Sequence, residues 1–123
     1  MPGQIQPGIA SESLVESIDI YPTLCELCNV SPNPNIEGQS FSDVLLDPAA
    51  ESKQTAYSFL YKSSNAIART LRTTDHRLIV WGPLGTPDHV ELYDYSSDPD
   101  GKQNVADQYP GTVDLLIDIV SGL

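Results

Sequence analysis

The residues with the most recognisable chemistry in this chain are Cys25 and Cys28, which form a C-x-x-C motif. Such a pair can be a redox couple or half of a zinc site. A zinc site needs four ligands, but the sequence has no second C-x-x-C and only 2 histidines. A thioredoxin-like couple would begin a helix, whereas both cysteines lie late in the helix expected here. We therefore interpret them as structural residues on its buried side.

The other titratable residues match no catalytic or metal-binding motif. His76 and His89 are not accompanied by a G-x-S-x-G sequence, so we expect surface histidines. Asp94, Asp98 and Asp100 precede a glycine, but no glutamate stands at the EF-hand distance, and the composition is typical of a tight turn. We predict no catalytic, cofactor-binding or metal-binding residue in this chain.

Charge restricts the partners. The formal net charge is -11, from 17 acidic and 6 basic residues. This surface repels phosphate backbones and anionic lipids, so we expect no nucleic-acid partner and no membrane partner. Three of the basic residues are Arg69, Arg72 and Arg77. They could form an anion-facing patch, but we favour their pairing with the many surface carboxylates.

Four segments show the period-2 alternation of β-strands and are separated by turn residues. They are residues 55–61, 66–73, 76–81 and 89–95. In the third strand Leu78 and Val80 share one face. The first strand is apolar on both faces, which predicts a central position in the sheet. Turns are expected at 62–65 and 74–75, and a Gly/Pro loop at 82–88.

Helices are expected on both sides of this sheet segment in the sequence. Residues 17–28 have Pro22 in the first turn, Asn29 as a C-terminal cap and a buried apolar stripe. The stripe consists of Ile18, Tyr21, Leu24, Cys25 and Cys28. A short helix at 41–46 is capped by Ser40, and one helical turn is expected at 104–108. Thr112 caps a final helix, which covers one sheet face through Val113, Leu116, Ile117 and Val120.

The chain is therefore predicted to have an α+β fold. A small four-stranded antiparallel sheet carries the C-terminal helix on one face and is preceded by an N-terminal helix and a short helix. The length of 123 residues and the hydrophobic content of 40% suit a single domain, 1–123. It comprises a tether or edge strand (1–16, with the strand at 11–16), a helical segment (17–54) and the sheet with its helix (55–123).

Four segments together resemble the C-terminal region of sulfatases. SIDIYPTLCELC at 17–28 is similar to the family's "(V/I)D-(L/I)-(Y/F/M)-PTL-x-x-L" helix, and IEGQSFSDVL at 36–45 resembles the turn that follows it. ART at 68–70 with HRLIVW at 76–81 resembles its "R-T … Y-R-(L/Y)-x-x-W" strand pair. ELYDY at 91–95, with the later DP and NVA, is similar to the family's ending. The YPTLCEL and RLIVW sequences are most like the iduronate-2-sulfatase group, within the alkaline-phosphatase-like superfamily.

The resemblance implies a part of a sulfuric ester hydrolase that acts on sulfated glycans. Such enzymes use a formylglycine made in a C-x-P-x-R or S-x-P-x-R motif, beside a calcium ion. Neither motif occurs here. We therefore expect no cofactor in this segment, and place calcium and formylglycine in a catalytic N-terminal domain of the same polypeptide, which would be the partner. The segment alone would be inactive and would support or help shape the substrate pocket. The family implies a periplasmic, secreted or lysosomal location.

Two alternatives stay open. The chain could be a stand-alone acidic interaction module that shares only the fold. It could also be the equivalent part of a phosphodiesterase or phosphonate hydrolase of the same superfamily, because the nucleophile that distinguishes these enzymes is not in this segment.

Overall fold

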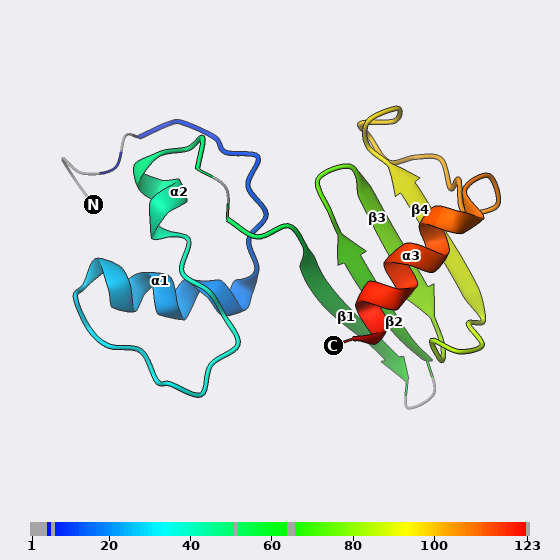
Figure 1. Ribbon diagram of the computed structural model, residues 1–123, viewed down its shortest axis with the longest axis horizontal. Helices are drawn as coiled ribbons and strands as arrows, with labels where there is room; N and C mark the ends of the chain where they lie inside the picture. Colours follow the sequence, from blue (N-terminus) through cyan, green and yellow to red (C-terminus); the bar gives the residue numbers. More distant parts are fainter. Residues whose placement is uncertain (1–4, 6, 51, 64–65, 123) are drawn as a thin grey trace. The chain divides into compact units, whose positions relative to one another are not determined.

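The computed structural model describes residues 5, 7–50, 52–63 and 66–122. The chain divides into two compact units, Met1–Gln54 and Thr55–Leu123 (Figure 1). This boundary separates the expected helical segment from the sheet segment. The expectation that both belong to a single domain stays a prediction.

The second unit is the predicted four-stranded antiparallel sheet. Its strands are β1 (Ala56–Ser63), β2 (Ala66–Arg72), β3 (His76–Trp81) and β4 (His89–Asp94), in the order β1-β2-β3-β4. In the register, Tyr57 pairs with Leu71, Leu71 with Leu78, and Leu78 with Leu92. Residues 64 and 65 of the expected first turn lie outside the described residues. The fold class predicted from the sequence is confirmed.

The expected central position of β1 is wrong. β1 is an edge strand that pairs with β2 alone among the named strands. Hairpin connections pair each strand of a meander with the next one, so the first strand must lie at an edge. Phe59 and Tyr61 of β1 remain 56% and 70% exposed. Their apolar character therefore does not indicate burial between two neighbouring strands.

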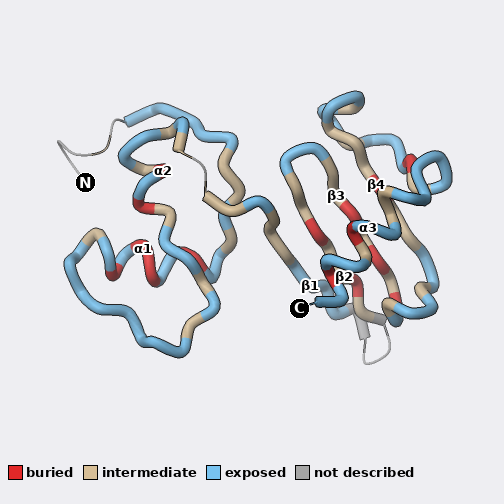
Figure 2. Tube along the Cα trace, in the orientation of Figure 1, coloured by how far each residue is buried: buried red, intermediate tan, exposed pale blue. Residues whose placement is uncertain are grey.

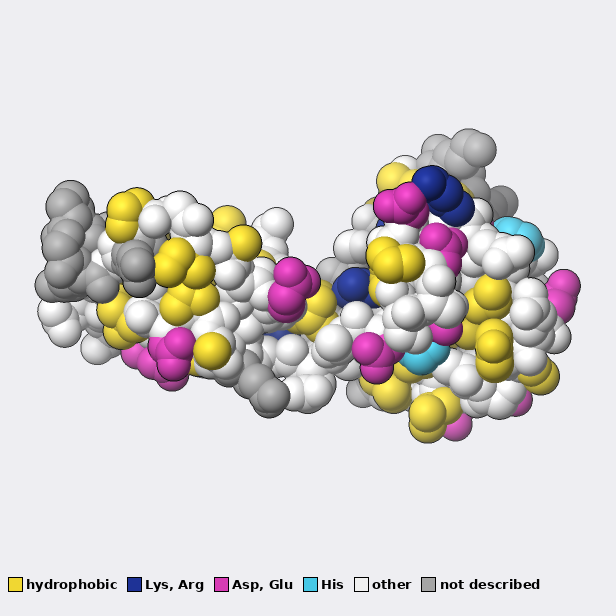
Figure 3. All heavy atoms as spheres, turned by 90° about the horizontal axis from the view of Figure 1, so that it is seen from above, with side chains coloured by type: hydrophobic (Ala, Val, Ile, Leu, Met, Phe, Trp, Pro, Cys, Tyr) yellow, Lys and Arg dark blue, Asp and Glu magenta, His cyan; other side chains and the backbone are white. Residues whose placement is uncertain are grey.

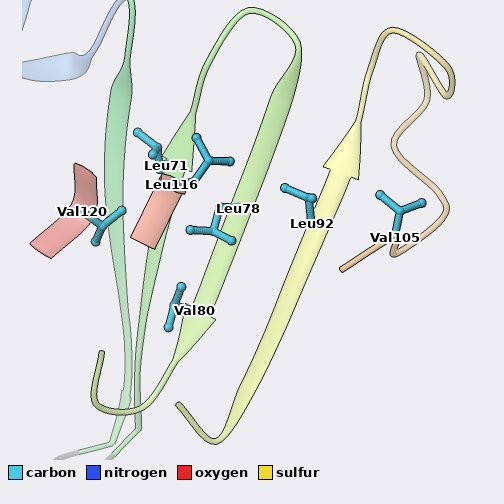
Figure 4. Packing of buried hydrophobic residues seen from close by; sticks show 7 residues of the cluster. All are labelled: Leu71, Leu78, Val80, Leu92, Val105, Leu116 and Val120. Carbon is cyan, nitrogen blue, oxygen red and sulfur yellow. The ribbon is translucent and has the colours of Figure 1, made fainter. Parts of the chain in front are cut away.

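Helix α3 (Pro110–Ser121) covers one face of this sheet, as predicted (Figure 1). The buried hydrophobic positions of this unit lie on β2, β3 and β4, on the inner side of α3 and at Val105 in the loop before it (Figure 2). Their core cluster comprises Leu71, Leu78, Val80, Leu92, Val105, Leu116 and Val120 (Figure 4). Thr112 is not the helix cap. α3 begins at Pro110, because proline lacks the N–H that the first helical turn leaves unpaired.

The first unit contains a 3-10 turn, η1 (Ser17–Asp19), that continues into α1 (Ile20–Leu27). α1 ends in the capping geometry expected for Asn29, whose φ is 54°. The Asn29 N–H donates to the Glu26 carbonyl at 3.0 Å, and the Val30 N–H donates to the Cys25 carbonyl at 2.8 Å. These two bonds form a Schellman motif, which satisfies carbonyls at the end of the helix.

The predicted burial of the apolar stripe on this helix is wrong. Ile18, Tyr21 and Leu24 are 52%, 50% and 56% exposed, and Cys28 is also exposed, so only Cys25 of the stripe is buried. The helix instead turns its other side inward. That side carries Asp19, Pro22 and Thr23, which lie within the unit.

A polar contact explains this choice of face. The Thr23 hydroxyl donates to the Asp19 carbonyl at 2.7 Å and accepts the Phe41 N–H at 3.0 Å. Gly38 lies so close to η1 that a Cβ there would stand 2.1 Å from the Ile18 carbonyl oxygen. The loop before the short helix α2 (Ser42–Leu46) therefore rests against the polar side of η1 and α1.

The predictions for three short segments, 11–16, 41–46 and 104–108, agree with the structure only in part. Residues 11–16 form no strand, and Leu14 makes a single antiparallel bridge to Lys53. α2 begins at Ser42, whose N–H donates to the Ser40 hydroxyl at 3.2 Å. The turn expected at 104–108 is present as a hydrogen-bonded turn, with the Gln108 N–H on the Val105 carbonyl at 2.9 Å.

Candidate functional site

The C-x-x-C motif does not form a site. Both thiols are free, with Cys25 buried and Cys28 exposed at the end of α1. Our interpretation of both as buried is therefore wrong for Cys28. Within the described ranges, no three His, Cys, Asp or Glu side chains gather closely enough to hold a metal ion.

The two histidines lie at opposite ends of the β3–β4 ladder. His76 pairs with Asp94, and His89 pairs with Trp81 at the other end. His89 is exposed, with Nε2 3.6 Å from the Glu91 Oε1 atom, whereas His76 is partly buried. The structure therefore does not bring the two imidazoles together.

The aspartates after β4 build a turn, as predicted. The Asp94 carboxylate accepts bonds from the Ser96 N–H at 2.9 Å and the Ser97 hydroxyl at 2.8 Å. The bonds from Ser96 and Ser97 lower the Asp94 pKa to about 2. Asp98 accepts the Gln103 N–H at 2.8 Å, which lowers its pKa as well. These carboxylate oxygens accept hydrogen bonds from residues of the turn itself, as Asp side chains commonly do in turns.

The most developed side-chain arrangement lies on the sheet face opposite α3. Successive strand residues point to opposite faces of a sheet. Leu71, Leu78 and Leu92 are buried on one face, so the residues next to them in sequence lie on the opposite face. The neighbouring row pairs Arg72 with Arg77, and Arg77 with Tyr93. Both arginines therefore project from the face that α3 does not cover.

The arginines stack on tyrosines. The guanidinium carbon of Arg72 lies 3.7 Å from the ring centre of Tyr95, and that of Arg77 lies 4.8 Å from Tyr93 and 5.7 Å from Tyr95. Such contacts are cation–π interactions. Arg69 lies on the other face, where its Nη1 donates to the Gly82 carbonyl at 2.9 Å. Within the described part of the chain none of the three forms an ion pair, so the favoured pairing with carboxylates is wrong.

Glu91 ties the aromatic residues of the same face together. Its carboxylate accepts the Trp81 Nε1–H at 3.2 Å and the Tyr93 hydroxyl at 2.6 Å. The hydrogen bond to Glu91, aided by burial, raises the Tyr93 pKa. Trp81, Glu91, Tyr93 and Tyr95 did not emerge as functional candidates from the sequence. Strand alternation over residues 76–81 predicts that Trp81 shares a face with Arg77, whereas Glu91 and Tyr93 join that face only through the register between strands.

A second polar cluster joins distant segments of the first unit. The Lys53 ammonium lies 2.6 Å from Glu16 and within 2.8 Å of both Asp19 carboxylate oxygens. Asp19 is fully buried and also accepts the Gln39 N–H at 2.9 Å and the Glu16 N–H at 2.7 Å. All its partners come from this chain, so the cluster is a structural clasp.

The first unit also carries an open hollow of about 580 Å³, bordered by Pro22, Glu26, Ile36 and Ser40 among others. Glu26 is the one titratable residue among the described residues that line it. Hydrogen bonds from the Ser40 and Ser42 hydroxyls lower the pKa of this exposed carboxyl. The hollow therefore offers one carboxylate and no second group for acid–base chemistry.

No helix in the described part of the chain is long and apolar enough to cross a membrane.

Known proteins resemble this chain over nearly its whole length. Arylsulfatase K of Gallus gallus is 30% identical over 129 residues, which cover 95% of this chain and 24% of the relative. Arylsulfatase K of Xenopus laevis is 31% identical over 123 residues, which cover 89% of this chain and 22% of the relative. The chain thus spans less than a quarter of the length of these relatives.

Solved structures share the fold. A protein in complex with its substrate D-glucosamine-2-N,6-O-disulfate superposes with a TM-score of 0.81 at 23% identity, over 98% of this chain and 26% of that one. A Bacteroides fragilis protein assigned as a sulfatase gives a TM-score of 0.78 at 24% identity, over 93% of this chain and 25% of that one. The family described as N-sulphoglucosamine sulphohydrolase, C-terminal, matches residues 1–117. This chain therefore belongs to that family of C-terminal sulfatase regions.

Proposed function

We propose that this chain is the C-terminal part of a sulfatase that hydrolyses sulfate esters of sulfated glycans. The observation that carries the proposal is the family match over residues 1–117. The relatives Arylsulfatase K of Gallus gallus and of Xenopus laevis support the proposal, and this chain covers 24% or less of each. A structural neighbour was solved with a disulfated glucosamine as its substrate, which supports a sulfated sugar as the substrate class.

The chemistry is proposed to lie in a catalytic domain that precedes this segment in the same polypeptide. The chain contains neither C-x-P-x-R nor S-x-P-x-R, so it cannot supply a formylglycine nucleophile. We place the formylglycine and a calcium ion in that domain. This segment supports the domain and helps shape the substrate pocket, and it releases no sulfate by itself.

Exposed apolar side chains support docking to another domain. Ile18, Tyr21 and Leu24 repeat at a spacing of three along η1 and α1, and each is at least half exposed. Hydrophobic side chains gather on the surface of the first unit, on the left of Figure 3. A group of exposed apolar side chains of this kind is typical of a surface that another part of a protein covers.

The test compares the complete polypeptide with this chain alone. We expect the complete polypeptide to release sulfate from 4-nitrophenyl sulfate and from sulfated disaccharides, and the chain alone to release none. The matched control replaces the Cys or Ser of the formylglycine motif by Ala in the complete polypeptide. Sulfate release by the chain alone would contradict the proposed division of labour.

The same assay decides the substrate and the reaction class. Desulfation of a 2-O-sulfated iduronate would support the iduronate-2-sulfatase-like subtype suggested by YPTLCEL and RLIVW. Release of N-linked or 6-O-linked sulfate would argue for a different subtype. Turnover of a phosphodiester or phosphonate without sulfate release would replace the sulfatase proposal by the related hydrolases. A sulfatase of this kind would act in a secreted, lysosomal or periplasmic setting.

A further inference from the structure

Arg72 and Arg77 have no acidic partner among the residues that the structure describes. The Lys53 ammonium binds Glu16 and Asp19, and Lys102 pairs with Asp100. Arg72 and Arg77 form no ion pair within the described residues, although the chain has 17 acidic residues and a net charge of -11. No carboxylate in the described part of the chain therefore forms an ion pair with these two arginines.

The two guanidinium groups are also incompletely hydrogen-bonded. The Arg72 Nη1 and Arg77 Nε atoms are buried and have no hydrogen-bond partner among residues 5, 7–50, 52–63 and 66–122. A buried donor without an acceptor costs free energy, and such groups are rare in finished structures. Both side chains are only partly buried as a whole, so other edges of each guanidinium remain at the surface.

Neighbouring aromatic rings hold the guanidinium groups in place. Arg72 stacks on Tyr95, and Arg77 lies over Tyr93. Stacking leaves the in-plane N–H groups of a guanidinium to bind a planar acceptor, for which a carboxylate is the best match. Glu91, an acid on the same face, accepts hydrogen bonds from Trp81 and Tyr93. We name this surface the arginine face: Arg72, Arg77, Trp81, Glu91, Tyr93 and Tyr95.

We propose that the arginine face is a docking surface on which Arg72 and Arg77 receive carboxylate side chains of the polypeptide that precedes residue 1. The inference deepens the proposed function and rests on it, because it assigns a contact surface for the catalytic domain. Relatives of which this chain covers 24% or less contain ample chain to supply the partner. Arginine with tyrosine and tryptophan is also the composition enriched in protein interfaces.

A sulfated glycan is the competing occupant. The arginine face offers two cations beside Glu91, on a chain of net charge -11. A polyanion would be repelled by that surface, whereas a folded domain can present one or two carboxylates within a contact that excludes water. A lasting protein contact would also bind the N–H groups at the exposed edges of both guanidinium groups continuously, as a transient ligand would not. These points favour the protein carboxylate.

The test replaces each arginine by lysine in the complete polypeptide. Arg72→Lys and Arg77→Lys introduce amines that a carbodiimide couples to a carboxylate in direct contact. We expect mass spectrometry to find residues 72 and 77 linked to Asp or Glu in the sequence before residue 1. Arg69→Lys is the matched control, because Arg69 lies on the opposite sheet face and should give no such link.

Each outcome has a defined meaning. Links confined to acids within 1–123, no link at either position, or links found only in a covalent dimer would overturn the proposal. In the unmodified polypeptide we expect a heparin-derived oligosaccharide to leave the phenylglyoxal reactivity of Arg72 and Arg77 unchanged. Protection by this oligosaccharide would overturn the protein assignment in favour of a glycan site.

Sulfate release measured on the same samples separates the two proposals. Sulfate release without the predicted cross-link refutes the arginine contact and leaves the sulfatase function standing. The cross-link without sulfate release refutes the function and leaves the docking surface standing.

Discussion

The Lys53 ammonium reaches across 34 residues of sequence to contact both carboxylate oxygens of Asp19, at 2.8 and 2.7 Å. Asp19 has no exposed surface, and the Lys53 side chain is only 12% exposed. The contact joins the end of the first unit to η1, at its beginning. Since a buried charge is costly when its partner is lost, the pair should matter more to stability than a surface ion pair.

Replacing Lys53 by Met should therefore destabilise the first unit. The substitution keeps most of the apolar stem but leaves the Asp19 charge buried, which costs about 3 kcal/mol for pairs of this kind. Urea unfolding, monitored through hydrogen exchange at the amides of α1, measures the loss of stability. Lys102→Met is the matched control, because Lys102 pairs with Asp100 at a highly exposed site and should change stability by less than about 1 kcal/mol. Equal losses for the two variants would contradict the structural role of the clasp.

The same pair predicts how stability depends on pH. Burial tends to raise the Asp19 pKa, but hydrogen bonds from Lys53 and from two backbone N–H groups outweigh it and lower the pKa below 3.8. A carboxyl with a lowered pKa contributes stability above 3.8 and loses it as the pH falls through its folded-state value. Burial tends to lower the Lys53 pKa, but bonds to Asp19 and Glu16 raise it above 10.5. That contribution is present below pH 10.5 and is lost as the pH rises through the folded-state value.

Unfolding in urea at a series of pH values from 2 to 12 checks both limbs. In Asp19→Asn, the acid-induced loss that belongs to this carboxyl should disappear, and the remaining acid dependence should come from the other carboxyls. An acid limb of unchanged size in that variant would show that Asp19 is not the responsible group.

Gly38 should tolerate no side chain. A Cβ at this position would lie 2.1 Å from the Ile18 carbonyl oxygen, so backbone must move. We expect Gly38→Ala to destabilise the first unit by about 1–3 kcal/mol, the usual range for overpacking. Gly111→Ala provides the control, because nothing lies within 4 Å of its added Cβ in the first turn of α3. Alanine there should be neutral or slightly stabilising, since it favours the helix. Thermal unfolding distinguishes the two, and a stable Gly38→Ala protein would refute the close approach.

The cover that α3 provides for the sheet can be tested at two adjacent leucines. Leu116 is 5% exposed and belongs to the core cluster, whereas Leu115 is 61% exposed. Leu116→Ala should lower the free energy of unfolding by about 2–5 kcal/mol through lost burial and a cavity. Leu115→Ala removes the same atoms and should have little effect. Similar losses at both positions, measured by urea unfolding, would mean that α3 packs on the sheet differently.

The strands and the last helix were predictable because their patterns are local. Leu78 and Val80 alternate with their neighbours, and this alone placed them on one shared face, which the structure shows to be buried. The stripe that includes Leu116 and Val120 likewise identified the inner side of α3. The sequence predicts Thr112 as the cap of that helix, whereas α3 begins at Pro110, because sequence alone does not separate a proline that starts a helix from one in the loop before it.

The candidate surfaces were harder to predict from the sequence. Arg72, Arg77 and Tyr95 come from different parts of the meander, and they meet only because of the register between strands. A shift of one residue would have placed one arginine on the other face. Likewise, no local pattern indicated that Asp19 would be buried, because its partner Lys53 is far away in the sequence.

The sequence by itself determined the α+β fold, the four strands and the resemblance to C-terminal sulfatase regions. The fold and the strands follow from apolar spacing and turn residues over a few positions, whereas the resemblance rests on the motifs themselves. Only the tertiary structure decided that β1 lies at an edge and that α1 buries Pro22 and Thr23 while Leu24 stays exposed. It also decided that Arg72 and Arg77 stack on tyrosines. The physical reason is that periodicity shows which residues share a face, while burial and pairing depend on what that face meets across long distances in sequence.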